Sequence, residues 1–291
     1  MLIETVIAEF LADGRYRKLS DKTNRIYTYV LKNFHNFCKT QEQTDFEKVD
    51  SNLLKKYALF LQEVKENSTG GVAFQFRVVR ALFGYANRED IPNTQPFKRF
   101  RMPKVELPVM QFIERDEYDV LIAASRGSDK PMRDSSIISI LYDTGIRVGE
   151  LQNLCSPDVL GDRGMLLVRG KTGERLVPVS RHVLKRLGQY MAHERPVSKL
   201  ANIFLTDAQT AMTYHAVALM LQRTSKRAGV KYKSPHCFRR GYVTQMVKNG
   251  ADLFHVQRAL GHKTLVMTNR YAVLNEDSLK QVHLIASPTR K

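Results

Sequence analysis

The chain has 291 residues, of which 43% are hydrophobic and 26% charged, and it carries a formal net charge of +17 at pH 7. This composition is that of an ordinary globular protein, and it excludes disordered and collagen-like chains. The chain contains no run of about 18 apolar residues, the length needed to span a membrane. The N-terminus has acidic residues and no cleavage-site pattern, so we expect no secretory signal. The three cysteines are widely spaced and form no CxxC pair, which predicts a reduced, cytoplasmic chain without disulfides or a zinc knuckle.

The positive charge is uneven along the chain. Residues 1–100 carry a net charge of +4, and the other 191 residues carry +13. Residues 208–251 contain no acid and eight bases. These bases are Arg223, Lys226, Arg227, Lys231, Lys233, Arg239, Arg240 and Lys248. A solvated helix face usually mixes both signs, so this stretch indicates a surface for phosphates, and nucleic acid is the expected partner.

Apolar residues recur at helical spacing in the first 100 residues. Three stripes are formed by Ile26, Val30, Phe34 and Phe37, by Leu54, Tyr57, Leu61 and Val64, and by Val72, Phe76, Val79, Phe83 and Ala86. With a short helix near residues 2–12, they predict a four-helix bundle whose aromatic residues form the core. Ser20 and Asp50 are candidate N-caps. Arg77 and Arg80 lie off the third stripe, where they could meet DNA or simply be solvated.

A proline-rich and basic segment follows the bundle. Residues 91–109 contain four prolines, and proline breaks helices and stiffens a connector. We therefore expect a helical domain over residues 1–95, a basic linker over 96–110 and a second domain over 111–291.

The second domain is predicted to be mainly helical with a small antiparallel sheet, which makes it a mixed α+β domain. Two β-rich runs, 165–170 and 175–179, flank the turn sequence KTGE and predict a hairpin. Helices are expected over 114–125, 134–142, from about 147, 180–193, 213–228, 236–248, 252–259 and about 275–285.

Several residues have chemistry suited to a phosphate, although each pattern is weak alone. Arg147 opens a helix after a glycine break, where backbone N–H groups and a planar guanidinium both favour anions, and Glu150 follows one turn later. Lys171 is at the predicted hairpin tip. His236 and Arg239 share a helix face, so they could hold a phosphate and move a proton.

The joint order of these residues is more specific. Arg147-x-x-Glu150-Leu151, Lys171 in a hairpin, His236-x-x-Arg239, Leu260-Gly261-His262 and Tyr271 nine residues further on resemble the tyrosine recombinase (phage integrase) family, and its compact Xer-like branch most of all. The likeness covers essentially the whole chain, including TGIRVGEL, VRGKTGERLVPV and LGHKTLVMTNRY. One departure is Arg240, where the family commonly has histidine.

The resemblance implies an N-terminal core-binding (SAM-like) domain and a catalytic domain that together clamp duplex DNA. It also implies roles for six residues. Tyr271 would be the nucleophile that forms a 3′-phosphotyrosyl bond, Arg147 and Arg239 would bind the phosphate, Lys171 would protonate the leaving oxygen, and His236 and His262 would assist, with Glu150 in support. Neither a metal nor ATP nor any other cofactor is implied.

The resemblance also implies partners. These are duplex DNA with specific sites, a homotetramer or a second recombinase acting through a Holliday junction, and accessory DNA-binding proteins in some systems. A bacterial or phage origin is expected. Leu279, Val282 and Ile285 lie at roughly helical spacing in the tail, residues 276–291, and we hypothesise that this tail docks on a neighbouring subunit. Further candidates for DNA contact are Arg223, Lys226, Arg227 and Arg240.

Three alternatives stay open on the sequence alone. The biological role is either resolution of replicon dimers or movement of a mobile element, including resolution of its cointegrates. A catalytically inactive, architectural DNA-binding relative would keep the fold without the reaction. A type IB topoisomerase or telomere resolvase would share the same residue types.

Overall fold

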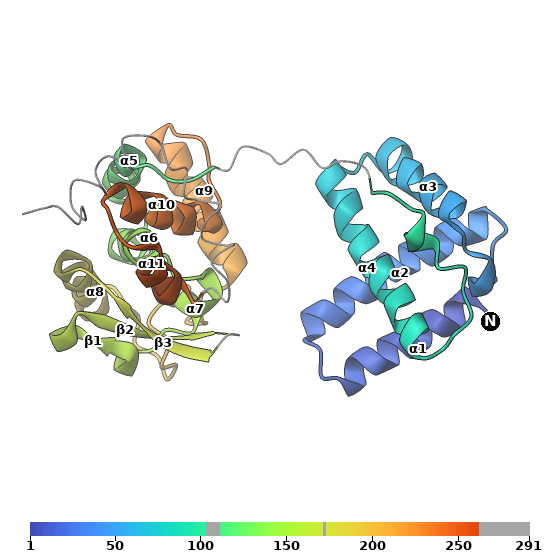
Figure 1. Ribbon diagram of the computed structural model, residues 1–291. Helices are drawn as coiled ribbons and strands as arrows, with labels where there is room; N and C mark the ends of the chain where they lie inside the picture. Colours follow the sequence, from blue (N-terminus) through green and yellow to red (C-terminus); the bar gives the residue numbers. More distant parts are fainter. Residues whose placement is uncertain (103–110, 171–172, 262–291) are drawn as a thin grey trace, which may run out of the picture. The chain divides into compact units, whose positions relative to one another are not determined.

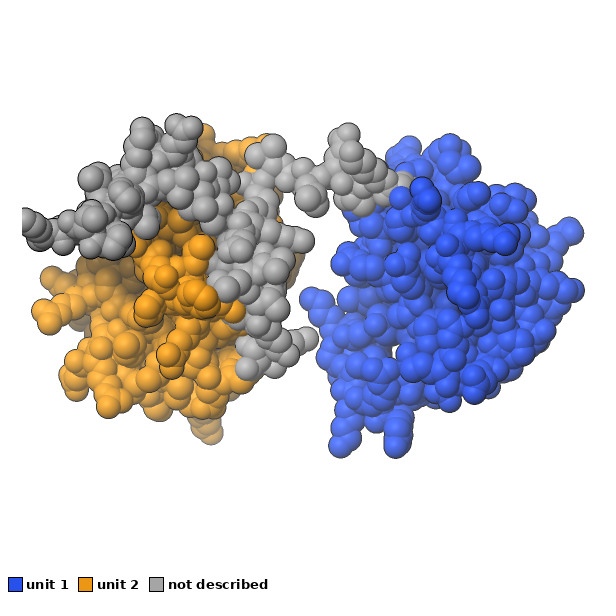
Figure 2. Space-filling model, in the orientation of Figure 1, with its two compact units in different colours: residues 1–109 blue, residues 110–291 orange. Residues whose placement is uncertain are grey.

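The computed structural model describes residues 1–102, 111–170 and 173–261 (Figure 1). The chain divides into two compact units, Met1–Val109 and Met110–Lys291, which Figure 2 draws in different colours. Each unit has its own hydrophobic core. Lys171, His262 and Tyr271, together with the predicted helix near 275–285 and the tail, lie outside the described residues.

Over its described residues, 1–102, unit 1 is built from helices and short turns. Its helices are α1 (Ile3–Tyr16), α2 (Asp21–Thr40), α3 (Ser51–Leu59) and α4 (Thr69–Arg88). Short turns cover Phe46–Lys48, Phe60–Val64 and Pro96–Lys98. The predicted four-helix arrangement is confirmed.

Local sequence explains where these helices begin. Ser20 caps α2 by accepting a hydrogen bond from the backbone N–H of Thr23, and Asp50 caps α3 by accepting from Asn52 and Leu53. The predicted apolar stripes are buried with one clear exception. Val64 is 64% exposed, because Phe60–Val64 forms a π-helical turn that changes the angular spacing of its side chains.

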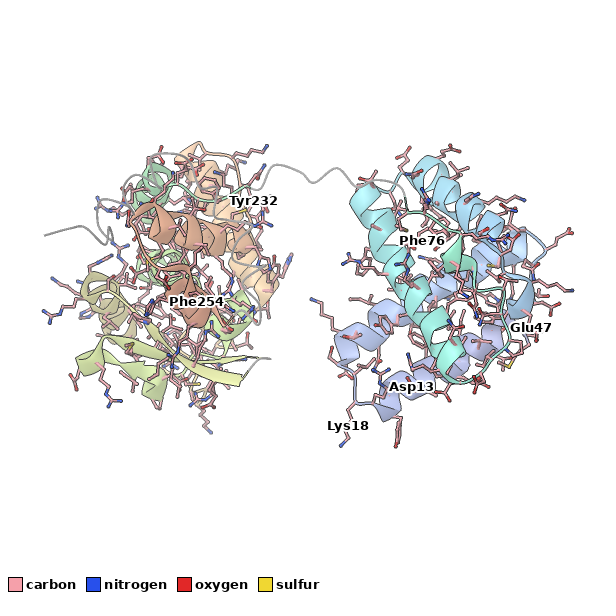
Figure 3. The ribbon with its side chains drawn as sticks, viewed as in Figure 1. Asp13, Lys18, Glu47, Phe76, Tyr232 and Phe254 are labelled. Carbon is pink, nitrogen blue, oxygen red and sulfur yellow. The ribbon has the colours of Figure 1, made fainter. Side chains whose placement is uncertain are left out.

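The core of unit 1 is rich in aromatic rings, and Phe76 lies within it (Figure 3). Phe100 stacks on Phe76 with ring centroids 4.7 Å apart and is only 5% exposed. Phe97 and Met102 pack against the same core. Residues 96–102, which the sequence analysis assigned to the linker, are therefore part of unit 1 in the structure, because their apolar side chains fill its core.

Unit 2 combines a small sheet with several helices. Its helices are α5 (Arg115–Ser125), α6 (Pro131–Thr144), α7 (Val148–Gln152), α8 (Arg181–His193), α9 (Tyr214–Ala228), α10 (Pro235–Lys248) and α11 (Leu253–Leu260). Its strands are β1 (Val159–Leu160), β2 (Met165–Gly170) and β3 (Gly173–Pro178). The mainly helical class with a small antiparallel sheet is confirmed.

The sheet is a meander in the order β1-β2-β3, and both pairs are antiparallel. Strand β1 has two residues and was not predicted, because so short a run carries no periodic signal. In the β2–β3 register Val168 pairs with Arg175 and Leu166 with Val177. Arg175 thus lies on the same face of β3 as the buried Val177, which directs its side chain toward the interior of the unit.

Helix α6 is the central element of unit 2. It packs against α5, α8 and α10, and most of its residues are buried. Near it, α10 and α11 share a small apolar cluster formed by Tyr242, Val243, Val256 and Leu260. This packing brings the end of α6, the short helix α7, strand β3 and the end of α11 together.

Candidate active site

The site begins where α6 ends. Gly145 closes that helix with a left-handed backbone, φ +60°, a conformation that suits glycine. Arg147 follows in an extended conformation as the N-cap of α7, and its backbone N–H donates to Glu150 Oε2 at 2.8 Å. This bond holds Arg147 at the start of a helix, as the sequence predicted.

Glu150 is a buried carboxylate, 2% exposed, held by two arginines. Arg147 Nη1 donates to its Oε1 at 3.0 Å. Arg175 donates through Nη1 to Oε1 at 2.8 Å and through Nη2 to Oε2 at 2.9 Å. Burial alone would raise the pKa of Glu150, but the hydrogen bonds from Arg175 and Arg147 outweigh it and hold the pKa below its ordinary value. The group is therefore an anion at neutral pH.

Two arginines also bind the C-terminal end of α11. Arg239, buried in α10, donates through Nη1 to the carbonyl of Gly145 at 2.6 Å and through Nη2 to that of Leu260 at 2.8 Å. Arg175 Nε donates to the carbonyl of Ala259 at 2.8 Å. The last carbonyls of a helix lack partners within it and form the negative end of its dipole, so both contacts stabilise the end of α11.

His236 is the second residue of α10 and is exposed at the surface of the unit. Partial desolvation, followed by the positive charges of Arg239, Arg240 and Arg147, lowers the pKa of His236 below its ordinary value. The imidazole is therefore neutral at pH 7. A neutral ring surrounded by guanidinium groups is suited to gain a proton when an anion approaches.

The structure thus pairs Arg147 with Glu150 and binds Arg239 to the ends of α6 and α11, and His236 lies close enough to both arginines for their charges to act on it. Lys171 and His262 lie outside the described residues, but the glycines that precede them lie close to the Glu150–Arg175 pair. A Cβ on Gly170 would lie 2.9 Å from Glu150 Oε1, and one on Gly261 would lie 3.3 Å from the Arg175 side chain. The hairpin and the end of α11 therefore both approach the Glu150–Arg175 pair.

Sequence reasoning missed Arg175. The signal was its alternation with Val177 and Val179, which places an arginine on the buried face of a strand. A buried arginine needs an anionic or carbonyl partner, and the structure supplies Glu150 and Ala259.

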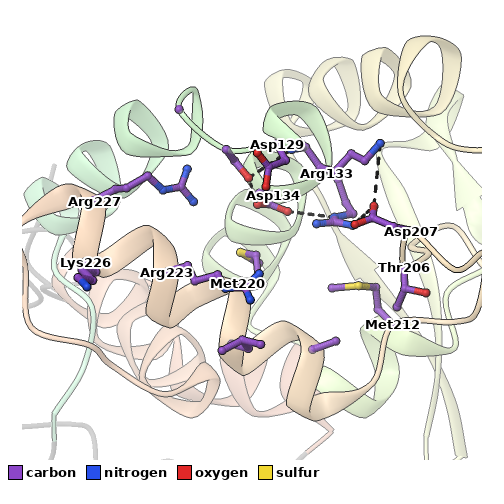
Figure 4. Close-up of a pocket in the computed structure, with 15 residues that line it drawn as sticks. Asp129, Arg133, Asp134, Thr206, Asp207, Met212, Met220, Arg223, Lys226 and Arg227 are labelled. Carbon is purple, nitrogen blue, oxygen red and sulfur yellow. Dashed lines mark hydrogen bonds and ion pairs between the residues drawn. The ribbon is translucent and has the colours of Figure 1, made fainter.

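The further candidates for DNA contact fall in separate places. Arg77 and Arg80 are exposed on α4, where their guanidinium groups lie over the rings of Phe74 and Phe97. On α9 three exposed bases line a pocket of about 630 Å³ (Figure 4). These are Arg223, Lys226 and Arg227. The opposite wall of that pocket carries acids, among them Asp129 and Asp207, and Arg147, His236 and Arg239 are not among its lining residues.

The acid-free stretch of 208–251 is not one open basic surface. Lys233 donates to Glu117 at 2.5 Å, and Arg227 and Arg240 donate to the carbonyls of Ala124 and Gln111. Lys248 lies over the ring of Phe112. Part of its charge therefore holds α9 and α10 against the segment 111–124, which the sequence alone could not reveal.

Within residues 1–102, 111–170 and 173–261 no helix is long and apolar enough to cross a membrane. No group of three or more His, Cys, Asp or Glu side chains there has the arrangement of a metal site.

Known proteins resemble this chain over most of its length. Residues 111–277 match the model of the phage integrase family, and residues 5–102 match that of the phage integrase SAM-like domain. The tyrosine recombinase XerC of Staphylococcus aureus is 31% identical over 282 residues, which cover 94% of this chain and 93% of XerC.

Two solved structures share the fold. The integrase of transposon Tn1549, in complex with transposon right end DNA, has a TM-score of 0.84 at 19% identity and covers 98% of this chain and 100% of that one. The site-specific recombinase XerH, bound to its difH substrate, has a TM-score of 0.71 at 19% identity, with 90% of this chain and 79% of that chain covered.

Proposed function

The chain belongs to the phage integrase family, the tyrosine recombinases, and is a site-specific recombinase that cleaves and rejoins DNA; from this premise we propose which residues perform the reaction. Tyr271 is the nucleophile. Its phenolic oxygen attacks a DNA phosphodiester, forms a 3′-phosphotyrosyl bond and releases the 5′-oxygen as a hydroxyl. Attack by that hydroxyl on the phosphotyrosine restores the phosphodiester, so no external energy source is required.

Arg147 and Arg239 stabilise the charge on the phosphate in the transition state. The observation that carries this assignment is the buried carboxylate of Glu150, which holds Arg147 at a helix start while Arg239 lies against the end of α6. The side chain of Arg147 is 33% exposed, so its guanidinium has access to a ligand. Two fixed guanidinium groups supply positive charge at the phosphate without any metal ion.

Lys171, His236 and His262 assist the proton transfers. Lys171 protonates the leaving 5′-oxygen, and His262 donates a hydrogen bond to the phosphate. The lowered pKa of His236 supports a role as proton acceptor from Tyr271, because the ring is neutral before the anion binds. Removing the phenolic proton is required, since a free tyrosine has a pKa of about 10.

The assembly and domain roles follow from the family chemistry. One tyrosine cuts one strand, and recombination of two duplexes requires four cuts, so four subunits act on two paired sites through a Holliday junction, either as a homotetramer or with a second recombinase. The helical domain, unit 1, binds the core site, and the tail of residues 276–291 docks on a neighbouring subunit. A chain lacking 276–291 should still bind DNA but fail to recombine it; full recombination by that chain would refute docking of the tail.

Two biological roles are candidates, and each is suggested by a protein that this chain resembles. Similarity to XerC favours resolution of replicon dimers in a bacterial cytoplasm, and the fold shared with the Tn1549 integrase favours movement of an element. The sequence identity is higher to XerC, so we propose dimer resolution. Recombination between two directly repeated chromosomal sites is the expected activity.

A nicked duplex tests the catalytic proposal. DNA bound by the protein is selected from random fragments, and a nick is then placed beside the scissile phosphate so that the released fragment diffuses away. The wild-type chain should accumulate a covalent protein–DNA adduct that survives SDS, while Tyr271→Phe should bind the same duplex and form none. Tyr232 is an exposed tyrosine of the same unit, so Tyr232→Phe is the matched control and should react like wild type.

DNA binding without any adduct from wild type would favour an architectural relative. Relaxation of a plasmid lacking the selected site would instead favour a topoisomerase.

A further inference from the structure

We propose that Arg175 is a positioning residue for the recombination reaction: by binding both oxygens of Glu150 it prevents this carboxylate from closing on Arg147, and so leaves the Arg147 guanidinium available to the DNA phosphate. The inference rests on the proposed role of Arg147. Arg175 lies on β3, and none of the six candidate catalytic residues belongs to this strand.

The geometry of the pair is that of a planar fork on a carboxylate. Arg175 donates Nη1 to Glu150 Oε1 at 2.8 Å and Nη2 to Oε2 at 2.9 Å. Its side chain is 13% exposed and that of Glu150 is 3% exposed. A bidentate bond between a guanidinium and a carboxylate is strong and fixes the plane of both groups. The orientation of Glu150 is therefore set by Arg175.

Arg147 is bound much more lightly. Its backbone N–H and one side-chain nitrogen, Nη1, donate to Glu150. Among the described residues, the other guanidinium N–H groups of Arg147 have no protein acceptor. An arginine has five side-chain N–H donors, so most of this guanidinium stays free for an anion.

Removal of Arg175 would change this balance. Glu150 would remain buried and anionic with one side-chain partner, and an unpaired buried charge is strongly unfavourable. Arg147 is the remaining cation in contact with it. We expect the Arg147 guanidinium to rotate onto both carboxylate oxygens, which turns its donors away from the phosphate.

A plain structural role is the competing explanation, because Arg175 also donates Nε to the carbonyl of Ala259. Loss of that bond would loosen the end of α11, the helix that precedes His262. The two explanations differ in their dependence on the charge of Glu150. Capture of Arg147 requires a carboxylate at position 150, whereas the bond to Ala259 does not.

A double-mutant cycle separates the two explanations. The rate of covalent adduct formation on the nicked, selected duplex is measured for wild type, Arg175→Met, Glu150→Gln and the double variant, alongside binding to the intact duplex. Arg175→Met should slow the adduct about 100-fold, as expected for a lost transition-state donor, with DNA binding within about threefold of wild type. In the Glu150→Gln background the same substitution should slow it less than about threefold.

A matched control is Arg186→Met. Arg186 is a half-buried arginine on α8 that donates to Ser139 Oγ at 2.7 Å, away from Glu150. It should change the adduct rate less than about threefold in both backgrounds. If thermal unfolding shows that Arg175→Met is not folded, Arg175→Lys replaces it in the cycle. A smaller loss of adduct rate is then expected, and that loss should again disappear in the Glu150→Gln background.

Each other outcome overturns the inference. An equal loss in both backgrounds would assign Arg175 to the bond with Ala259 alone. A loss of DNA binding as large as the loss of cleavage would make Arg175 a binding residue. No adduct from wild type would refute the proposed function itself, and this inference with it.

Discussion

Replacement of Gly145 by alanine tests the packing that holds the active site together. Gly145 has φ +60°, and a Cβ there would lie 2.6 Å from Cδ1 and 2.9 Å from Cγ of Tyr242. Tyr242 is 7% exposed and belongs to the small cluster shared by α10 and α11, so its ring has little room to move. The carbonyl of Gly145 also accepts the 2.6 Å hydrogen bond from Arg239.

The expected loss of stability has two parts. A left-handed conformation costs an alanine about 1–2 kcal/mol. Overpacking against a buried ring adds about 1–3 kcal/mol, which gives about 2–5 kcal/mol in total. Gly229 supplies a matched control, since it closes α9 with φ +67° and a Cβ there would meet nothing within 4 Å. Gly229→Ala should therefore show only the first part.

Thermal unfolding of the full chain measures the difference. For a unit of this size 1 kcal/mol corresponds to roughly 2–4 °C in Tm. The ring contact is expected to cost Gly145→Ala about 1–3 kcal/mol more than Gly229→Ala, so the Tm of unit 2 should fall by roughly 2–12 °C more in Gly145→Ala. Adduct formation should also fall in Gly145→Ala at temperatures where it is folded, because the carbonyl that holds Arg239 moves. Equal losses in the two variants would refute the reasoning.

Two further predictions follow from the contacts described above. Phe100→Ala should destabilise unit 1 by about 3–5 kcal/mol in urea unfolding, because a ring that is 5% exposed and stacked on Phe76 is lost. As the control, Val64→Ala at an exposed position should cost less than about 0.5 kcal/mol. An equally small effect of Phe100→Ala would contradict the assignment of residues 96–102 to the core of unit 1. The pKa of His236, lowered by desolvation and by the charges of Arg239, Arg240 and Arg147, should rise when inorganic phosphate binds, because an anion favours the protonated ring. Histidine NMR signals, assigned with His236→Gln, measure that pKa, and no change at saturating phosphate would contradict a phosphate site there.

Local sequence was sufficient for much of unit 1. The stripes containing Phe34, Tyr57 and Phe76 are buried as predicted, and the caps at Ser20 and Asp50 begin α2 and α3. These features depend on residues within a few positions of one another, which is the range over which helical periodicity and capping act. The hairpin at 165–179 is local in the same way.

The sequence was less informative wherever partners are distant along the chain. The burial of Phe100 against Phe76, and the use of Lys233 to bind Glu117, bring together residues that no periodic pattern connects. Both observations changed an interpretation: part of the expected linker packs in a core, and part of the expected phosphate surface binds its own chain.

The sequence by itself determined the family, the two helical regions and the order of the candidate catalytic residues, because motif spacing and periodicity are properties of a linear chain. Only the tertiary structure showed that Glu150 binds both Arg147 and Arg175, and that Arg175 also binds the end of α11. A buried carboxylate must find its cations in three dimensions, and Arg175 lies 25 positions away on another element. Because of that separation, the sequence could identify Arg147 as a candidate but not Arg175, which is proposed to leave the Arg147 guanidinium available to DNA.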